Sequence, residues 1–289
     1  MNSTYRKISQ IAHQKIYEFI KLSQLDISNY HFQYYFDYIT NKNNIIVFPH
    51  HFDNDLILGI TMVDNCGISL SYEKNSIGTR QNFTKCHELG HIILKHQGKV
   101  FTEQVNNKSG SELEADYFSS IILAPDIVLI HKILYQNKRY SEISKELSIS
   151  NLALEVRLTH LLQTYTTIPY PKIKGMISSF RANTNYKQRF IDCLVDFQQI
   201  IVSHYNTVTP KPLHLFDYLL EHQNLITQCN CPQLIEKEFQ EQLLNQYNNI
   251  KIWSYYNKGK TLWYAWNTDK LTDIEAKQKV KLIYTLKFL

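Results

Sequence analysis

The spacing of apolar residues predicts helices at the start of the chain and strands after them. Apolar residues recur every three or four positions over 4–24, and the aromatic-rich stretch 29–39 continues this pattern, so both are expected to be helical. Short β-branched runs bounded by Asn, Asp and Gly then predict strands at 44–50, 56–63 and 67–73. A turn at 64–67 would join the last two strands in an antiparallel meander.

Helical periodicity returns after residue 80. A helix beginning near Asn82 or Thr84 is expected to end at Gly98, because Lys95 and His96 precede this glycine and cations favour a helix C-terminus. A second helix is predicted to begin at 109–111 and to run to Pro125. Two more helices are expected within 127–163.

Two prolines in the stretch 167–175 predict a boundary between two domains, 1–166 and 167–289. The second domain is expected to contain three helices, a hairpin and a final helix with a Thr-x-x-Glu capping box, at about 184–205, 212–224, 233–247, 250–266 and from Thr272. The predicted fold class is α+β. A small antiparallel sheet would pack against helices in the first domain, and a smaller α+β domain would follow.

The composition is that of a folded globular protein, with 44% hydrophobic and 20% charged residues. No apolar run reaches the roughly 18–20 residues of a membrane span, and the N-terminus lacks the pattern of a signal peptide. Five scattered cysteines do not form a disulfide framework, so we expect free thiols. These features predict a cytoplasmic protein without a membrane partner.

The positive charge is concentrated near the C-terminus. The chain has a net charge of +5, and residues 249–289 hold eight Lys, three acidic residues and all three Trp. A basic surface with aromatic side chains can bind nucleic acid. The alternative is a hairpin whose aromatic side chains are core and whose lysines keep it soluble. We favour this second interpretation.

The strongest chemical signal is His87-Glu88-Leu89-Gly90-His91, the His-Glu-x-x-His pattern of zinc hydrolases. Residues four apart lie on one face of a helix, so both imidazoles can bind one Zn²⁺ ion. Glu88 is offset by about 100° on the helix, which places its carboxylate beside the ion, where it can act as general base toward a metal-activated water.

A catalytic zinc site needs a third protein ligand. Glu112 and Asp116 lie four residues apart on the next predicted helix, as in thermolysin-like zinc hydrolases. We therefore expect Glu112 to bind the metal and Asp116 to accept the second N–H of a ligating histidine. Glu114 is the alternative metal ligand. His96 is expected to interact only with the helix dipole.

Four motifs between residues 44 and 163 resemble the ImmA/IrrE-type metallopeptidases, in the same order as in that family. They are Phe83-Thr84-x-x-His87-Glu88-Leu89-Gly90-His91, Glu112-x-Glu114-Ala115-Asp116-x-Phe118, Ile122-Leu123-Ala124-Pro125 and Ile149-Ser150-x-x-Ala153-Leu154-x-x-Arg157-Leu158. Asn82 stands where the family usually has Arg, and Asp116 replaces the commoner Asn. Residues 168–289 match no motif of this family.

The resemblance implies a gluzincin-like fold and an intracellular zinc endopeptidase that cleaves a helix-turn-helix transcriptional repressor. Its protein substrate would add as an extended strand at a sheet edge near Ile68–Tyr72. Three side chains are candidates for stabilising the oxyanion, namely Tyr72, Tyr117 and His160.

Two other functions compete with this one. Residues 141–158 have the spacing of a helix-turn-helix, and the basic segment 249–289 could add phosphate contacts, which would make a DNA-binding regulator. The second of these helices carries few cations, which disfavours it as a groove-reading helix. The other alternative is a non-catalytic, zinc-stabilised regulatory protein. The intact Glu88 argues against it, because a structural zinc site needs no general base.

Overall fold

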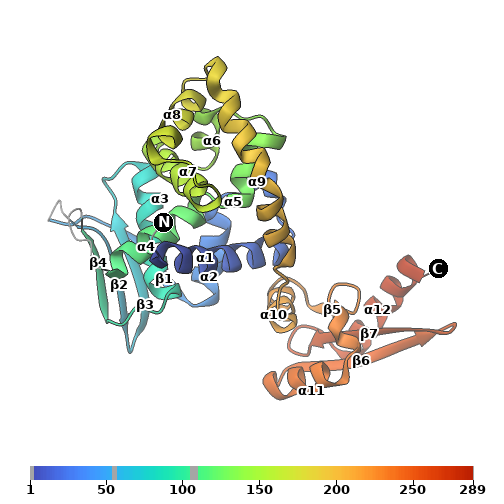
Figure 1. Cartoon of the computed structure of the whole chain (residues 1–289). Coiled ribbons are helices and arrows are strands. Elements are labelled where there is room, and N and C mark those ends of the chain that lie inside the picture. The colour runs from blue at the N-terminus through green and yellow to red at the C-terminus, as the bar shows by residue number, and fades with distance from the viewer. Residues whose placement is uncertain (1–2, 54–56, 105–109, 289) are drawn as a thin grey trace. The chain divides into compact units, whose positions relative to one another are not determined.

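The computed structural model describes residues 3–53, 57–104 and 110–288. The chain divides near Val208 into two compact units, one within residues 3–208 and one comprising 209–289 (Figure 1). The sequence predicted a boundary at 166/167. The difference arises because the segment after the two prolines is helical and buries Ile173, Ile177 and Phe190 in the core of the first unit.

The first unit opens with the two predicted helices, α1 (Ser3–Leu22) and α2 (Phe32–Lys42), joined by a short 3-10 helix at Ile27–Asn29. The apolar stripe of α1 is buried, with Ile8, Ile16 and Ile20 each at most 1% exposed. These helices pack in the main core together with the helices that carry the candidate metal ligands.

A four-stranded sheet follows, in the order β1-β3-β2-β4. The three predicted strands are present as β1 (Ile45–His50), β2 (Ile57–Asp64) and β3 (Gly67–Glu73), with predicted residue 56 outside the described residues. The predicted antiparallel sheet is wrong in one respect, because β1 pairs with β3 in parallel. The sheet is therefore mixed. The fourth strand, β4 (Val100–Gln104), pairs antiparallel with β2 and was not predicted.

The motif helix α3 (Gly78–Ile93) begins before the predicted caps and ends five residues before Gly98. Lys95 adopts a left-handed backbone conformation with a φ of 56°, which reverses the chain after the last turn. Helix α4 (Gly110–Leu123) follows. Its start was predicted at 109–111, and residue 109 lies outside the described residues.

The rest of the first unit is helical. It comprises α5 (Asp126–Ile130), a π-helical turn (His131–Tyr135), α6 (Tyr140–Glu146), α7 (Asn151–Tyr165), α8 (Tyr170–Arg181), a 3-10 turn (Asn185–Lys187) and α9 (Gln188–Thr207). Helices α8 and α9 pack against α7 and α5 respectively. The stretch Gly110–Tyr135 is long and apolar enough to cross a membrane, but 78% of its apolar window is buried within the protein, as in a core helix.

A buried ion pair lies where α5 meets α7. Arg157 donates through Nη2 to Asp126 and through Nε to the Ala124 carbonyl, 2.9 Å away. His13 Nε2 lies 3.3 Å from the same carboxylate. Burial alone would raise the pKa of Asp126, but the charges of His13 and Arg157 hold this pKa well below its usual range. Together with the bond to Ala124, the pair ties the start of α5 and the residues just before it to α7.

The second unit contains α10 (Pro212–His222), β5 (Leu225–Thr227), a 3-10 helix (Pro232–Ile235), α11 (Lys237–Gln246), β6 (Ile250–Asn257), β7 (Lys260–Asn267) and α12 (Asp273–Phe288). Its antiparallel sheet has the order β5-β7-β6, and separate apolar clusters cover its two faces. The predicted hairpin and the capping box of Thr272 and Glu275 are confirmed.

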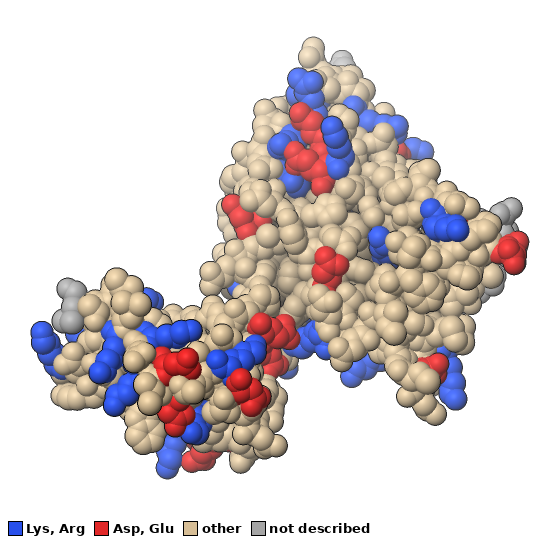
Figure 2. Space-filling model, turned by 180° about the vertical axis from the view of Figure 1, so that it is seen from behind, with Lys and Arg blue, Asp and Glu red and all other residues tan. Residues whose placement is uncertain are grey.

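On one face of the second unit the lysines do not form a continuous positive surface. On the face seen in Figure 2, Lys and Arg side chains are interspersed with Asp and Glu. Trp266 is buried and Trp263 packs partly against the core, whereas Trp253 is 66% exposed. The expectation that the hairpin aromatics are core thus holds for two of the three tryptophans.

Candidate metal centre

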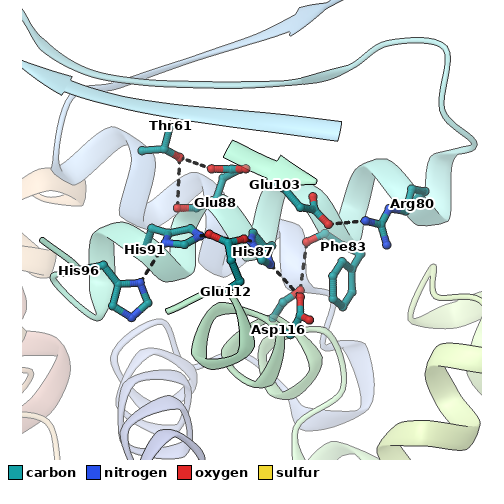
Figure 3. Close-up of polar contacts among 11 residues, drawn as sticks. Thr61, Arg80, Phe83, His87, Glu88, His91, His96, Glu103, Glu112 and Asp116 are labelled. Atoms are coloured by element: carbon teal, nitrogen blue, oxygen red, sulfur yellow. Dashed lines mark hydrogen bonds and ion pairs between the residues drawn. The ribbon is translucent and has the colours of Figure 1, made fainter. Parts of the chain in front are cut away.

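Helices α3 and α4 approach each other closely because Gly90 has no side chain. A Cβ at this position would lie 3.3 Å from the Ala115 Cα and 3.2 Å from the Phe118 ring. This contact brings the first turns of α4 against the histidine face of α3. Glu112 and Asp116 therefore reach the two histidines of the motif, as Figure 3 shows.

Three candidate ligands converge on one buried point. His87 Nε2 lies 3.0 Å from Glu112 Oε2 and 3.1 Å from His91 Nε2, and His91 Nε2 lies 3.5 Å from Glu112 Oε1. Ligand atoms bound to one tetrahedral Zn²⁺ at about 2.0–2.1 Å are about 3.3 Å apart. Two imidazoles and one carboxylate are also a donor set that zinc enzymes use. The residues present therefore fit a zinc ion.

Asp116 holds the first histidine in position. Its Oδ1 lies 2.9 Å from His87 Nδ1, so a proton on Nδ1 leaves Nε2 directed toward Glu112. Burial lowers the pKa of His87, but hydrogen bonds to Asp116 and Glu112 outweigh this effect and raise the pKa to about 10. The point between Glu112 and the histidines is thus electrostatically suited to a cation.

The second histidine contacts a residue that was not predicted to support it. His96 Nδ1 lies 2.9 Å from His91 Nδ1, and His96 Nε2 lies 3.1 Å from Glu114 Oε2. If His96 donates to Glu114, its Nδ1 accepts from His91, which leaves the His91 Nε2 lone pair for a metal. The expectation that His96 contacts only the helix dipole is wrong. Glu114, the alternative metal ligand, supports His96 instead.

Replacing His96 by Ala is expected to weaken zinc binding about 10–100-fold, the usual effect of removing such a supporting group. His91 would lose the acceptor that fixes its tautomer. The affinity is measured by competition with a chromogenic chelator. The matched control is His222→Ala, which removes an exposed histidine of the second unit. Equal zinc affinity of the His96→Ala variant and the unmodified chain would contradict this role.

Glu88 lies between the two histidines and strand β2 of the four-stranded sheet, as Figure 3 shows. Its Oε2 accepts a hydrogen bond of 2.6 Å from Thr61 on β2, and its Oε1 is buried with no hydrogen-bond partner among the described residues. Gly59 lets β2 pass directly over this carboxylate, since a Cβ there would lie 2.7 Å from Oε1. Burial raises the pKa of Glu88 to about 8. A buried carboxylate with one unpaired oxygen is suited to accept a proton.

Glu103 on β4 is a further acidic side chain at the site. It is 3% exposed, forms an ion pair with Arg80, and could share a cation with His87 and Asp116. Glu103 was not among the predicted site residues because the short strand β4 was not predicted. The strand reads Val-Phe-Thr-Glu-Gln, which does not alternate between apolar and polar residues, so local periodicity gave no signal for it.

The predicted substrate edge near Ile68–Tyr72 is wrong. Strand β3 pairs with β1 on one side and with β2 on the other, so it has no open edge. Of the three oxyanion candidates, Tyr117 and His160 pack together with Tyr5, and Tyr72 lies beneath the Lys85 ammonium group. Their involvement stays a prediction.

Comparison with known proteins supports the sequence resemblance. No curated protein and no solved structure matches the chain. Residues 69–159 match the Peptidase_M78 family, described as the IrrE N-terminal-like domain. This segment begins in β3 and contains α3, α4, α6 and the first part of α7, so it includes the candidate metal ligands, Glu88, His96, Glu103 and Asp116, but not Gly59 and Thr61 on β2. Residues 69–159 therefore form an IrrE N-terminal-like domain of the ImmA/IrrE-type metallopeptidases.

Proposed function

We propose that the chain is a zinc-dependent endopeptidase with a gluzincin-like site, in which His87, His91 and Glu112 hold one Zn²⁺ ion. The observation that carries the proposal is the convergence of these three buried side chains beside the half-paired carboxylate of Glu88. When bound, zinc lowers the pKa of water and polarises the carbonyl of the scissile peptide.

The protein side chains around the metal transfer the proton and position the groups that react. Glu88 takes a proton from the attacking water and delivers it to the nitrogen of the leaving amine. Thr61 fixes the Glu88 carboxylate through the bond to Oε2, which leaves Oε1 without a hydrogen-bond partner among the described residues. Asp116 and His96 orient the two histidine rings from outside.

By resemblance, we propose that the enzyme is cytoplasmic and that its protein substrate is a helix-turn-helix transcriptional repressor. An endopeptidase of this kind would be specific for one or a few proteins. Regulated cleavage of a repressor would then switch on the genes that the repressor controls.

A DNA-binding or purely regulatory role is less well supported. Residues 141–158 do form two helices, but the exposed face of α7 carries Leu152 and Val156, and Arg157 is buried in the ion pair with Asp126. A helix that reads a DNA groove presents polar and cationic side chains to it. The apolar face of α7 fits contact with protein better than contact with DNA.

The test is a cleavage assay with the zinc-loaded full chain and the product of a neighbouring repressor gene. Specific cleavage that a chelator abolishes and added zinc restores is expected. Absence of cleavage, combined with chelator-insensitive binding to DNA, would overturn the proposal in favour of the DNA-binding alternative.

A further inference from the structure

A mostly apolar pocket of about 310 Å³ lies next to the metal centre. Its walls come from the first half of α3, the end of α4 and the first turns of α7, and they include Ile77, Phe83, Leu123, Ala153 and Val156. An engineered apolar cavity of about 150 Å³ in another protein holds one benzene molecule. The pocket therefore has room for a large aliphatic or aromatic side chain.

Phe83 lies between the pocket and the candidate metal centre. The Phe83 ring lines the pocket, and its centroid lies 6.2 Å from that of the His87 ring. Four residues along a helix span about 6 Å, and an extended peptide advances about 3.3 Å per residue. A substrate cleaved beside His87 would thus place a side chain one or two residues from the scissile bond at this pocket.

The mouth of the pocket exposes apolar surface that a folded protein normally covers. Ile77 is 72% exposed, Leu152 is 69% exposed and Val156 is 43% exposed. All three line the same pocket, although Ile77 precedes α3 and the other two lie on α7. Clustered apolar side chains of this kind mark surfaces that bind a partner or ligand.

The wall also contains an unused hydrogen-bond donor. Arg80 lines the pocket, its guanidinium group is held by Glu103, and it lies over the Phe83 ring at 5.2 Å. Within the described part of the chain its Nε is buried and has no hydrogen-bond partner. Ligand sites commonly combine an apolar lining with a few polar groups of this sort.

We propose that this pocket binds an aliphatic or aromatic side chain of the substrate polypeptide, one or two residues from the scissile bond. The Arg80 Nε donates to a backbone carbonyl of the same segment. The inference rests on the proposed function, since it takes the bound chain to be a polypeptide cleaved at the metal centre. The pocket then determines which peptide bonds are cut.

The experiment profiles cleavage of peptide pools by mass spectrometry, using the zinc-loaded full chain, an Ala153→Trp variant that fills the pocket, and an Ala182→Trp control. Ala182 is exposed at the end of α8 and lies away from the pocket. The unmodified chain and the control are expected to prefer Leu, Met or Phe over Gly at one fixed position by about 10–200-fold, the range for apolar side-chain discrimination. Ala153→Trp should lose this preference while keeping its zinc.

Cleavage without any apolar preference, or an unchanged preference in the Ala153→Trp variant, would overturn the pocket assignment and leave the peptidase proposal intact. If Ala153→Trp does not fold, Val156→Trp at the partly exposed rim replaces it. If no peptide is cut, fluorescence polarisation with the same pools shows whether the pocket assignment fails together with the peptidase proposal. Apolar-selective binding that Ala153→Trp removes would support the pocket and contradict the peptidase, whereas binding without selectivity would contradict both.

Discussion

Replacing Glu88 by Gln is expected to reduce peptide cleavage about 10²–10⁴-fold, the usual contribution of a general base. The amide has nearly the same shape and can still contact Thr61, but it cannot accept the proton that the carboxylate takes from water. Because Glu88 is not among the three candidate ligands, zinc content should stay unchanged. The rate constant and the zinc content are measured on the same preparation.

The matched control is Glu238→Gln, which makes the same chemical change at an exposed position on α11 of the second unit. This control should cleave at the rate of the unmodified chain. A Glu88→Gln variant that keeps both its zinc and more than about a tenth of the cleavage rate would contradict the assigned role, since loss of a general base costs more than this.

Replacing Arg157 by Met is expected to lower the free energy of unfolding of the first unit by about 3–5 kcal/mol, the cost of breaking a buried ion pair by removing one partner. Arg157 is 1% exposed, and its loss would leave the buried carboxylate of Asp126 with His13 and Tyr165 as its remaining polar partners. The Ala124 carbonyl would also lose its donor. Chemical denaturation of the full chain, followed by circular dichroism, measures the effect.

Arg181→Met is the control for this substitution. Arg181 forms an exposed ion pair with Glu155 at 3.4 Å, so its replacement should change the unfolding free energy by less than about 1 kcal/mol. Similar small effects of both substitutions would show that Asp126 is not held by Arg157. Because the chain has two compact units, the transition of each unit is fitted separately.

The arrangement of His87, His91, Glu112 and Asp116 was predictable because helical periodicity alone puts each pair on one face. Only the approach of α3 to α4 was needed to bring the pairs together, and Gly90 was a visible sign of that approach. Asp116 contacts His87, one of the two predicted histidine ligands, and Glu112 contacts both histidines, while metal binding by these residues stays a prediction.

His96 was misjudged because its position was calculated on a helix that continued to Gly98. The helix ends at Ile93, and the left-handed conformation of Lys95 folds the next residue back, so the His96 amide donates to the His91 carbonyl. A left-handed backbone conformation is uncommon in residues other than Gly or Asn, and the lysine at position 95 does not predict it. The imidazole of His96 therefore contacts His91 from outside the helix, at a position that helical spacing does not predict.

Sheet topology and the domain boundary depend on tertiary contacts that a local pattern does not contain. The parallel pairing of β1 with β3 requires β2 to pair on the other side of β3, which alternation of side chains does not specify. The prolines at 169 and 171 were interpreted as a linker, yet they lie at the start of α8, a position that tolerates proline because its N–H has no intrahelical partner.

The metal content of the purified full chain tests the central claim most directly. After loading with zinc and removal of excess metal, the unmodified chain and a Cys229→Ser control should retain about one equivalent, whereas His87→Ala, His91→Ala and Glu112→Ala should each lose most of it. A content below about half an equivalent in the unmodified chain, or full retention in the ligand variants, would contradict a zinc site built from His87, His91 and Glu112.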